Sequence, residues 1–335
     1  MSVASDTGLS PSVLRPSVAT GDGFIERTVV TSDGVRLAVR DYGSDRADAP
    51  TVVLLHGLLL SQESWEAQVD GLRRQWRGRI RIITYDHRGH GRSSGAPMVT
   101  YEIDQLAADL AQVLTAVQIT GPLTLAGHSM GGMTALAYLR RPAAERPVEP
   151  RGLVLVGTAA GGLAARGISR LLATPATEGL FGLVRRMPRQ ATDHAVGALI
   201  RPIGEVVARF SGGGTAVAAA AFRTASLSTA AGFLPSLKRY DVYDALESIT
   251  AKTFVISGGT DPLTPASHSR DLAAAIPDAV HLHHPSAGHM LLQEAAECVS
   301  TAISRAAGLR RGSRPARHRV SRNRSSAAHL AVVVS

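Results

Sequence analysis

The sequence predicts an α/β fold with a mostly parallel sheet of the eight-stranded type, helices on both faces, and an inserted helical cap. Three observations predict this class. Short uninterrupted apolar runs, such as Thr51–Leu55 and 152–156, are typical of parallel strands that are buried on both faces. Segments with helical periodicity alternate with these runs, and 101–118 is the clearest of them. Between 158 and 240 the alternation stops, and no strand-like run occurs.

The expected elements follow one another in a regular order along the chain. Strands are expected at residues 24–31, 35–41, 51–55, 80–84, 123–126, 152–156, 253–257 and 280–283, and helices at 64–76, 101–118, 133–139, 241–248, 266–276 and 290–307. Asp33-Gly34, between the first two strands, is a hairpin signal. Because helices separate the later strands, we expect those strands to run parallel to one another.

These features divide the chain into four parts. Residues 1–22 are rich in Ser, Thr, Gly and Pro, and we expect them to form a disordered leader. Residues 23–157 and 241–307 carry the α/β core, and 158–240 form a helical cap, or lid, inserted at a βα crossover. Residues 308–335 are expected to form a disordered, arginine-rich tail. The helical segments expected in the cap lie around 168–172, 179–187, 195–200, 205–210 and 216–225.

The net charge of +9 is concentrated at the C-terminal end of the chain. Residues 308–335 hold seven arginines and no acidic residue, so the other 307 residues carry 9 − 7 = +2. A basic tail is weak evidence for a nucleic-acid-binding fold, and we expect no specific nucleic-acid partner. Arginine outnumbers lysine 34 to 2, which indicates codon usage rather than a property of the site.

Cysteine content and hydropathy favour a cytoplasmic protein. The one cysteine, Cys298, lies in an expected helix, so no disulfide can form within the chain, and we expect a buried structural thiol. No apolar run reaches the roughly 18 residues that a transmembrane helix needs. The N-terminus lacks the apolar segment of a secretory signal peptide.

The candidate site centres on residues 123–141, where a G-x-S-x-G pattern joins an expected strand to an expected helix. The pattern comprises Gly127, His128, Ser129, Met130 and Gly131. A serine on such a tight turn has a strained backbone and an exposed hydroxyl, and small neighbours let the chain close around it. The helix that follows directs its positive dipole end at the same place, which suits a developing oxyanion. The pattern alone is short enough to occur by chance, so its weight comes from this context.

Polar residues suited to nucleophilic catalysis follow the strands on either side. Ligands bind at the carboxyl ends of parallel strands, and Ser129, Asp261 and His289 come just after three of them. A serine hydroxyl needs an adjacent base, which His289 would supply, and Asp261 would hold the imidazole in the required tautomer. The backbone N–H groups of Leu58 and Met130 are expected to bind the oxyanion.

The motifs around these residues resemble those of the α/β-hydrolase fold family over roughly residues 24–307. The matching segments are HGLLLS at 56–61, YDHRGHGRS at 85–93, GHSMGG at 127–132, GGTDPLTP at 258–265 and SAGHM at 286–290. The order of serine, aspartate and histidine along the chain is the order that the family uses. The chain is most similar to the serine esterase, monoacylglycerol-lipase-like and non-haem haloperoxidase-like branches. The serine distinguishes it from the epoxide hydrolase and haloalkane dehalogenase branches, which use an aspartate nucleophile.

The leading interpretation is a serine hydrolase that cleaves a carboxylic ester through an acyl-enzyme, with no cofactor. Two alternatives stay open. The same triad would serve a C–C bond hydrolase or a perhydrolase, and the same fold serves as a small-molecule receptor in some branches. Residues 158–240 include ten Arg or Lys and three Asp or Glu. A basic, aliphatic cap suggests an apolar small-molecule ester and leaves open a peripheral contact with an anionic membrane. The oligomeric state is left undetermined.

Other histidines have structural interpretations. We expect His128 to pack within the turn that carries the serine. We expect His87 and His90 to lie in a loop that Asp86 and Arg88 fix by hydrogen bonds and charge pairs.

Neither a metal site nor a nucleotide site is expected. His281 and His283 share one face of a strand but have no cysteine or acidic cluster near them in the sequence. Asp104 and Asp109 lie on a long expected helix and are interpreted as surface charges. No G-x-G-x-x-G pattern follows a strand, and no P-loop motif is present.

Overall fold

The computed structural model describes residues 23–44, 46–166 and 227–309, the short strand Val13–Arg15, and the isolated Gly179 and Gly182. Apart from those two glycines, the helical segments expected between 168 and 225 lie outside the described residues. The arginine-rich tail beyond Leu309 lies outside them as well.

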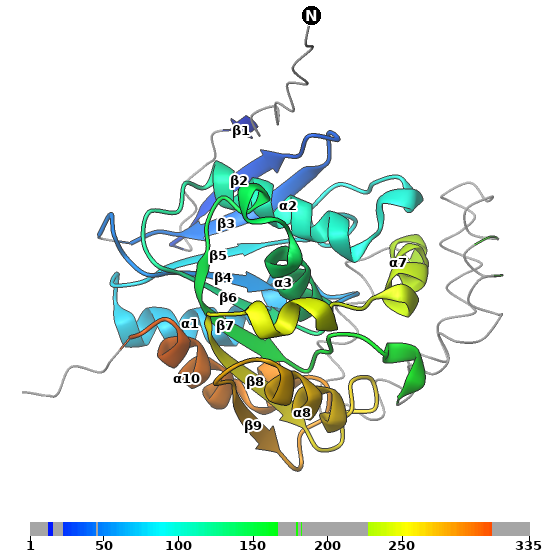
Figure 1. Ribbon diagram of the computed structural model, residues 1–335. Coiled ribbons are helices and arrows are strands. Elements are labelled where there is room, and N and C mark those ends of the chain that lie inside the picture. Colours follow the sequence, from blue (N-terminus) through cyan, green and yellow to red (C-terminus); the bar gives the residue numbers. More distant parts are fainter. Residues whose placement is uncertain are drawn as a thin grey trace, which may run out of the picture.

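One mixed, mostly parallel sheet forms the centre of the described structure (Figure 1). Its strands are β1 (Val13–Arg15), β2 (Ile25–Val30), β3 (Arg36–Tyr42), β4 (Thr51–Leu55), β5 (Arg81–Tyr85), β6 (Leu123–His128), β7 (Pro150–Val156), β8 (Lys252–Gly258) and β9 (Val280–His284). They lie in the order β1-β2-β3-β5-β4-β6-β7-β8-β9. The β1-β2-β3-β5 pairs are antiparallel, and the pairs from β5 to β9 are parallel. The eight expected strands are confirmed as β2 to β9.

Strand β1 is the ninth, and it lies where the sequence predicted a disordered leader. Val13, Leu14 and Arg15 pair antiparallel with Val30, Val29 and Thr28 of β2. The expectation was therefore wrong for these three residues. Main-chain hydrogen bonds to the edge of β2 define the strand, and a run this short leaves no periodicity to detect in the sequence.

Helices cover both faces of the sheet, as the sequence predicted. The α-helices are α1 (Glu66–Trp76), α2 (Ile103–Ala116), α3 (Met130–Arg140), α7 (Leu227–Arg239), α8 (Ala266–Ala275), α9 (Leu291–Glu294) and α10 (Ala296–Ala306). Short 3-10 helices lie at η1 (Gln62–Trp65), η2 (Met98–Thr100), η3 (Ala143–Glu145), η4 (Leu163–Ala165) and η6 (Tyr243–Ser248). Helix η6 replaces the helix expected at 241–248, and the helix expected at 290–307 is divided at Ala295, whose φ of −134° is not helical.

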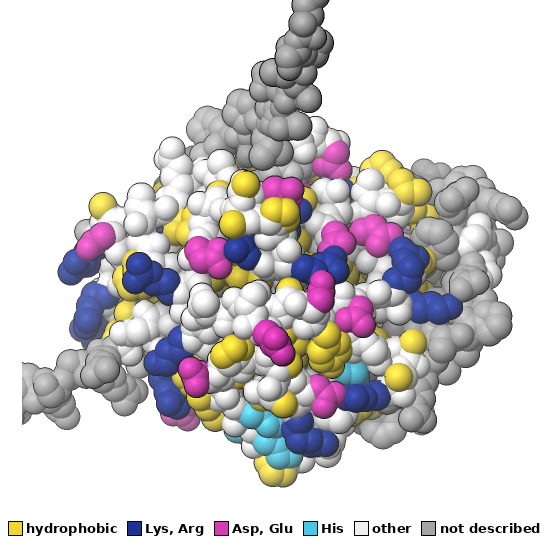
Figure 2. Space-filling view, viewed as in Figure 1, with side chains coloured by type: hydrophobic (Ala, Val, Ile, Leu, Met, Phe, Trp, Pro, Cys, Tyr) yellow, Lys and Arg dark blue, Asp and Glu magenta, His cyan; other side chains and the backbone are white. Residues whose placement is uncertain are grey.

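Two apolar cores lie on opposite faces of the sheet, because successive strand residues point in opposite directions. In β4, Val53 and Leu55 belong to the core that includes residues of α2, α3 and α8, whereas Val52 and Leu54 belong to the core that includes residues of α1, α9 and α10. Figure 1 shows helices on both faces of the sheet. On the face that Figure 2 shows, the described acidic and basic side chains are interspersed rather than segregated by sign. Arg140–Asp104 and Arg239–Glu102 are two ion pairs of the kind that this pattern allows.

Helix α7 is the longest described element of the expected cap. The sequence predicted a helical cap over 158–240 but no particular helical segment at 227–239, where Gly232 and Pro235 disfavour a helix interior. Packing explains the glycine: a Cβ at position 232 would overlap the ring of Tyr101. Phe233 of α7 lies 5.1 Å from the Tyr101 ring, and Ser236 accepts a hydrogen bond from the backbone N–H of Ile103 at 2.9 Å. These contacts hold α7 against the segment that begins α2.

Candidate active site

Ser129 occupies the turn between β6 and α3, as the sequence predicted. Its φ of 53° and ψ of −118° are unusual for any residue other than glycine, so the backbone is strained there. The turn is nevertheless well anchored. The N–H of Ser129 donates to the carbonyl of Val156 at 2.9 Å, and its own carbonyl accepts from Thr158 Oγ1 at 2.7 Å. The hydroxyl itself is half-buried, and it makes no hydrogen bond among the described residues.

The glycines of the motif are required by close approaches of main chain. A Cβ at Gly127 would overlap the backbone of Gly131, and a Cβ at Gly131 would overlap the backbone oxygen of Leu55 at the end of β4. A Cβ at Gly132 would lie 2.7 Å from Thr158 Cγ2. The turn can therefore pack directly against the neighbouring strands only because these side chains are absent.

Asp261 and His289, which follow β8 and β9, form a hydrogen-bonded pair. His289 Nδ1 lies 2.8 Å from Asp261 Oδ2, and the two side chains are 9% and 0% exposed. A carboxylate can only accept, so Nδ1 carries the hydrogen and Nε2 is left as an acceptor in the neutral ring. The pair is close to what a general base and its orienting acid require.

Several hydrogen bonds fix Asp261 in this position. Its Oδ1 accepts from the N–H groups of Leu263 and Thr264, at 2.8 and 3.0 Å, and its Oδ2 lies 2.8 Å from Thr264 Oγ1. Burial acts to raise the pKa of Asp261, but the charge and hydrogen bond of His289 and the bonds from Thr264 outweigh it and lower that pKa. The carboxylate is thus ionised at neutral pH. Sequence reasoning missed Thr264, whose place three residues after an Asp is the detectable signal.

His128 connects the serine turn with the loop that carries His289. Its Nε2 lies 2.8 Å from the main-chain oxygen of His289, to which it must donate, and the two rings are 4.9 Å apart. Burial, followed by the nearby His289, lowers the pKa of His128 to about 3, so this ring is neutral. The packing role expected for His128 agrees with these contacts. They bring the two loops together, and a direct contact between Ser129 Oγ and His289 Nε2 stays a prediction.

The loop after β4 brings Gly57 and Leu58 to the serine turn. A Cβ at Gly57 would lie 3.2 Å from Ser129 Cβ and 3.1 Å from His128 Nδ1, so the two main chains pack with little space between them. The Leu58 N–H makes no hydrogen bond within the described part of the chain. Met130 is the first residue of α3, where an N–H has no partner inside the helix. Both predicted oxyanion donors thus lack a hydrogen-bond partner among the described residues, and both adjoin the region where the main chains of Gly57 and Ser129 meet.

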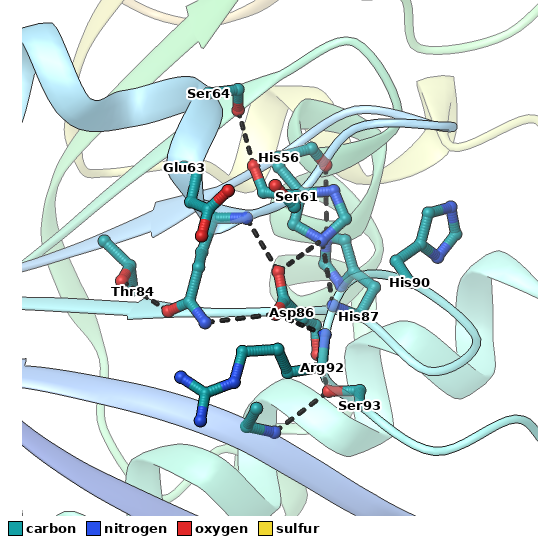
Figure 3. Close-up of polar contacts among 12 residues, drawn as sticks. His56, Ser61, Glu63, Ser64, Thr84, Asp86, His87, His90, Arg92 and Ser93 are labelled. Carbon is teal, nitrogen blue, oxygen red and sulfur yellow. Dashed lines mark hydrogen bonds and ion pairs between the residues drawn. The ribbon is translucent and has the colours of Figure 1, made fainter. Parts of the chain in front are cut away.

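A second loop, residues 86–94, clamps this first one (Figure 3). The carboxylate of Asp86 accepts from the N–H of Gln62 at 2.7 Å, from Gln62 Nε2 at 3.0 Å and from the N–H of Arg92 at 2.9 Å. The N–H of His87 donates to His56 Nε2 at 2.9 Å. The prediction that Asp86 fixes this loop is confirmed. Gln62 carried no signal that singled it out, and His56 was noted only as the first residue of the HGLLLS segment.

Asp109 is not a surface charge, and that prediction was wrong. It is fully buried and forms a two-bond ion pair with the equally buried Arg88, each bond 2.7 Å long. Asp33, in the hairpin between β2 and β3, is the second partner of Arg88 at 2.8 Å. Burial acts to lower the pKa of Arg88, but the two carboxylates outweigh it and raise that pKa. Asp104, in contrast, is exposed, as predicted.

His281 and His283 point to one hydroxyl rather than to an acidic cluster. Ser257 Oγ in the adjacent strand β8 lies 2.8 Å from His281 Nε2 and 2.9 Å from His283 Nδ1. Among the described residues, no group of three or more His, Cys, Asp or Glu side chains has an arrangement that would hold a metal ion. Within the same residues, no helix is long and apolar enough to cross a membrane.

The comparison with known families agrees with this architecture. The profile of the Alpha/beta hydrolase family matches residues 52–301, which include the serine turn, Asp261 and His289. The chain belongs to this family. The family defines the fold, and the reaction that a member catalyses depends on the residues of its own site.

Individual relatives differ in the chemistry that their names state. The chain is 38% identical over 121 residues to "Probable oxidoreductase EphD" of Mycobacterium tuberculosis, a match that spans 36% of this chain and 19% of that protein. It is 34% identical over 113 residues to "Bifunctional esterase/perhydrolase DCH" of Acinetobacter calcoaceticus, over 34% of this chain and 38% of that one. The chain thus spans less than half the length of either relative.

Solved structures share the fold over most of the chain. A thermophilic esterase from Thermogutta terrifontis superimposes with a TM-score of 0.64 and 26% identity, over 84% of this chain and 97% of the esterase. The protein is therefore an α/β-hydrolase-fold enzyme with esterase-like structural neighbours.

Proposed function

We propose that the protein is a serine hydrolase that cleaves a small-molecule carboxylic ester through an acyl-enzyme. Ser129 is the nucleophile, His289 the general base, and Asp261 the acid that orients the base. The observation that supports this most directly is the His289 Nδ1–Asp261 Oδ2 hydrogen bond of 2.8 Å at the edge of the sheet where the strained Ser129 lies. Esterase-like structural neighbours support the ester as the bond that is cleaved.

The chemistry uses only groups of the chain and water. His289 Nε2 accepts the hydroxyl proton while Ser129 Oγ bonds to the ester carbonyl carbon, and the carbonyl oxygen takes up the negative charge. The N–H groups of Leu58 and Met130 donate to that oxygen. As the tetrahedral centre collapses, the protonated His289 gives its proton to the departing alkoxide. Water then repeats the sequence on the acyl-enzyme, releasing the carboxylic acid and free Ser129.

The ionised Asp261 stabilises the imidazolium that forms in each half of this cycle. Because its pKa is already lowered by Thr264 and His289, it does not take the proton itself. Replacing Asp261 with Asn would retain the shape but lose the charge and allow the wrong tautomer. A decrease of about 10⁴-fold in kcat is the expected order of magnitude for such a change.

The experiment treats the whole chain with a fluorophosphonate probe and with p-nitrophenyl esters of graded chain length. We expect covalent labelling at Ser129, located by peptide mass spectrometry, and ester turnover that is lost in Ser129→Ala. Asp261→Asn should fold normally and turn over slowly. If Ser129 stays unlabelled, or if Ser129→Ala keeps full turnover, the proposal is wrong.

Perhydrolysis is a second candidate, because one relative is named a bifunctional esterase/perhydrolase. There the acyl-enzyme would transfer its acyl group to hydrogen peroxide instead of water, giving a peracid. Peracid formation from acetate and peroxide, measured by bromination of monochlorodimedone, separates the two reactions.

We also propose that 158–240 act as a cap over the site and that the substrate is apolar. The p-nitrophenyl ester series tests the second point.

A further inference from the structure

The peptide group between Gly57 and Leu58 has one end in the predicted oxyanion site and the other in a buried hydrogen-bond network. Its N–H belongs to Leu58, and its carbonyl belongs to Gly57. In a planar trans peptide these two bonds point in opposite directions. Whatever holds the Gly57 carbonyl therefore also sets the direction of the Leu58 N–H.

Two donors hold the Gly57 carbonyl. The backbone N–H of Leu60 donates to it at 3.1 Å and closes a four-residue turn, and His56 Nδ1 lies 2.8 Å from the same oxygen. Leu59, in the middle of the turn, has a φ of 61°, a left-handed conformation that favours glycine. The turn is thus strained at Leu59, and the bond from His56 helps to hold it in place.

The partners of His56 determine which of its nitrogens carries the hydrogen. A carbonyl can only accept, so Nδ1 must donate to Gly57. A backbone N–H can only donate, so Nε2 must accept from His87, at 2.9 Å. His56 is therefore the neutral Nδ1–H tautomer. It is fully buried, and burial lowers its pKa to about 4, although the bond to Gly57 acts in the opposite direction.

The loop of residues 86–94, which donates hydrogen bonds on the other side of His56, is itself held in place by hydrogen bonds. His87 Nε2 lies 3.1 Å from the backbone oxygen of His56, so the two residues are joined by two hydrogen bonds (Figure 3). Asp86 holds the far end of the oxyanion loop, which we define as residues 56–62 after β4, by accepting two hydrogen bonds from Gln62. The loop is thus clamped at both ends, and the Nδ1–H of His56 is the side-chain contact that reaches the peptide group itself.

We propose that His56 is a positioning residue that aims the Leu58 N–H at the oxyanion by holding the Gly57 carbonyl with its Nδ1–H. The inference rests on the proposed function, because only a reaction that forms an oxyanion uses this N–H. His56 does not touch the substrate. Its effect is on the transition state, where the negative charge develops, and not on ground-state binding.

Substitution of His56 by Asn or by Gln tests its two hydrogen bonds one at a time. The amide nitrogen of Asn lies near the position of Nδ1, so His56→Asn can keep the donor to Gly57 and lose the acceptor for His87. The amide oxygen of Gln reaches the position of Nε2, so His56→Gln keeps the acceptor and loses the donor. Each variant loses one buried hydrogen bond, so similar losses of stability are expected, but only the Gln variant releases the peptide group.

We expect kcat for ester hydrolysis to fall about 10- to 100-fold in His56→Gln, less than the loss of a whole oxyanion donor, with KM changed less than about twofold. The inhibition constant of a trifluoromethyl ketone, which forms a bound oxyanion, should rise by the same factor. In His56→Asn, the factor by which kcat falls should be less than about one tenth of the factor in His56→Gln. His90→Gln is the matched control, because it also loses one buried Nδ1 hydrogen bond, which in His90 goes to the Arg88 carbonyl and not to the Gly57 carbonyl. It should lower Tm and leave kcat near that of the wild type.

Equal losses of kcat in His56→Gln and His56→Asn, or an effect on KM alone, would overturn the proposal. A measurement on the wild-type protein needs no variant to fold: ¹⁵N NMR of the histidine rings at pH 7 must show His56 protonated at Nδ1 only, and any other form refutes the inference. The proposed function fails separately, if the wild-type protein neither hydrolyses esters nor is labelled at Ser129.

Discussion

Relieving the backbone strain at Ser129 should make the protein more stable while abolishing its activity. The φ and ψ of Ser129, 53° and −118°, are the mirror image of a common extended conformation, which glycine adopts without strain. A strained residue of this kind costs about 1–3 kcal/mol, and the greater freedom of glycine in the unfolded chain removes about 0.5–1 kcal/mol of the gain. Ser129→Gly should therefore increase the free energy of unfolding by about 1 kcal/mol.

Ser129→Ala is the control, because it removes the same hydroxyl and keeps the Cβ and the strain. Ser129 Oγ makes no hydrogen bond among the described residues, so the Ala variant should unfold close to the wild-type temperature. Scanning calorimetry on both variants is the measurement, and we expect Ser129→Gly to melt about 2–4 °C above Ser129→Ala. Both should lack ester turnover. A Gly variant that melts at or below the Ala variant would show that the turn stores no strain.

Three other predictions concern the buried network. Asp109→Ala leaves Arg88 buried with only Asp33 as a partner and should lower the free energy of unfolding by about 3–5 kcal/mol in urea, whereas Arg88→Met with Asp109→Leu should restore most of it. Gly131→Ala should give little folded protein on size exclusion, because its Cβ would overlap main chain of β4. Burial lowers the pKa of His90 and of His128 to about 3, so the unfolded chain binds protons first as the pH falls. Their contribution to the free energy of unfolding is complete above about pH 6.5 and is lost below it, by up to about 1.4 kcal/mol per pH unit for each histidine. Calorimetry from about pH 7 to 4 should therefore show a shallower fall in Tm with decreasing pH in His90→Asn.

The sequence was sufficient to predict the parts of the fold that repeat a regular pattern. Buried parallel strands are continuous apolar runs, and Asp33-Gly34 marks the antiparallel hairpin of β2 and β3, so all eight strands were detectable. Each catalytic candidate was found as a polar residue just after one of the parallel strands. Asp261 and His289, 28 positions apart in the sequence, form a hydrogen bond in the structure, and their catalytic roles stay a prediction. This success depends on local patterns combined with one rule of sheet geometry.

Features determined by long-range contacts could not be predicted in this way. Asp109 lies on a helix whose periodicity suggests an exposed acid, and only the approach of Arg88 from another loop makes its burial favourable. Helix α7 contains Gly232 and Pro235, and its conformation depends on packing against Tyr101. In both cases a contact with a distant part of the chain determines the structure, and the local sequence does not indicate that contact.

The two strained residues of the site each adjoin one of the two predicted oxyanion donors. Ser129 and Leu59 are both non-glycine residues with positive φ, and each is next to an N–H group without a partner among the described residues, Met130 after the first and Leu58 before the second. Unpaired N–H groups and left-handed backbone are both unfavourable, so neither would persist without support. The support is a set of buried hydrogen bonds that involve neutral imidazoles and the carboxylate of Asp86, which accepts from Gln62 and Arg92. The strained backbone lowers stability next to the two donors, and the buried hydrogen bonds behind them raise it. Relieving the strain at Ser129 should therefore increase stability, whereas releasing the Gly57 carbonyl should decrease it.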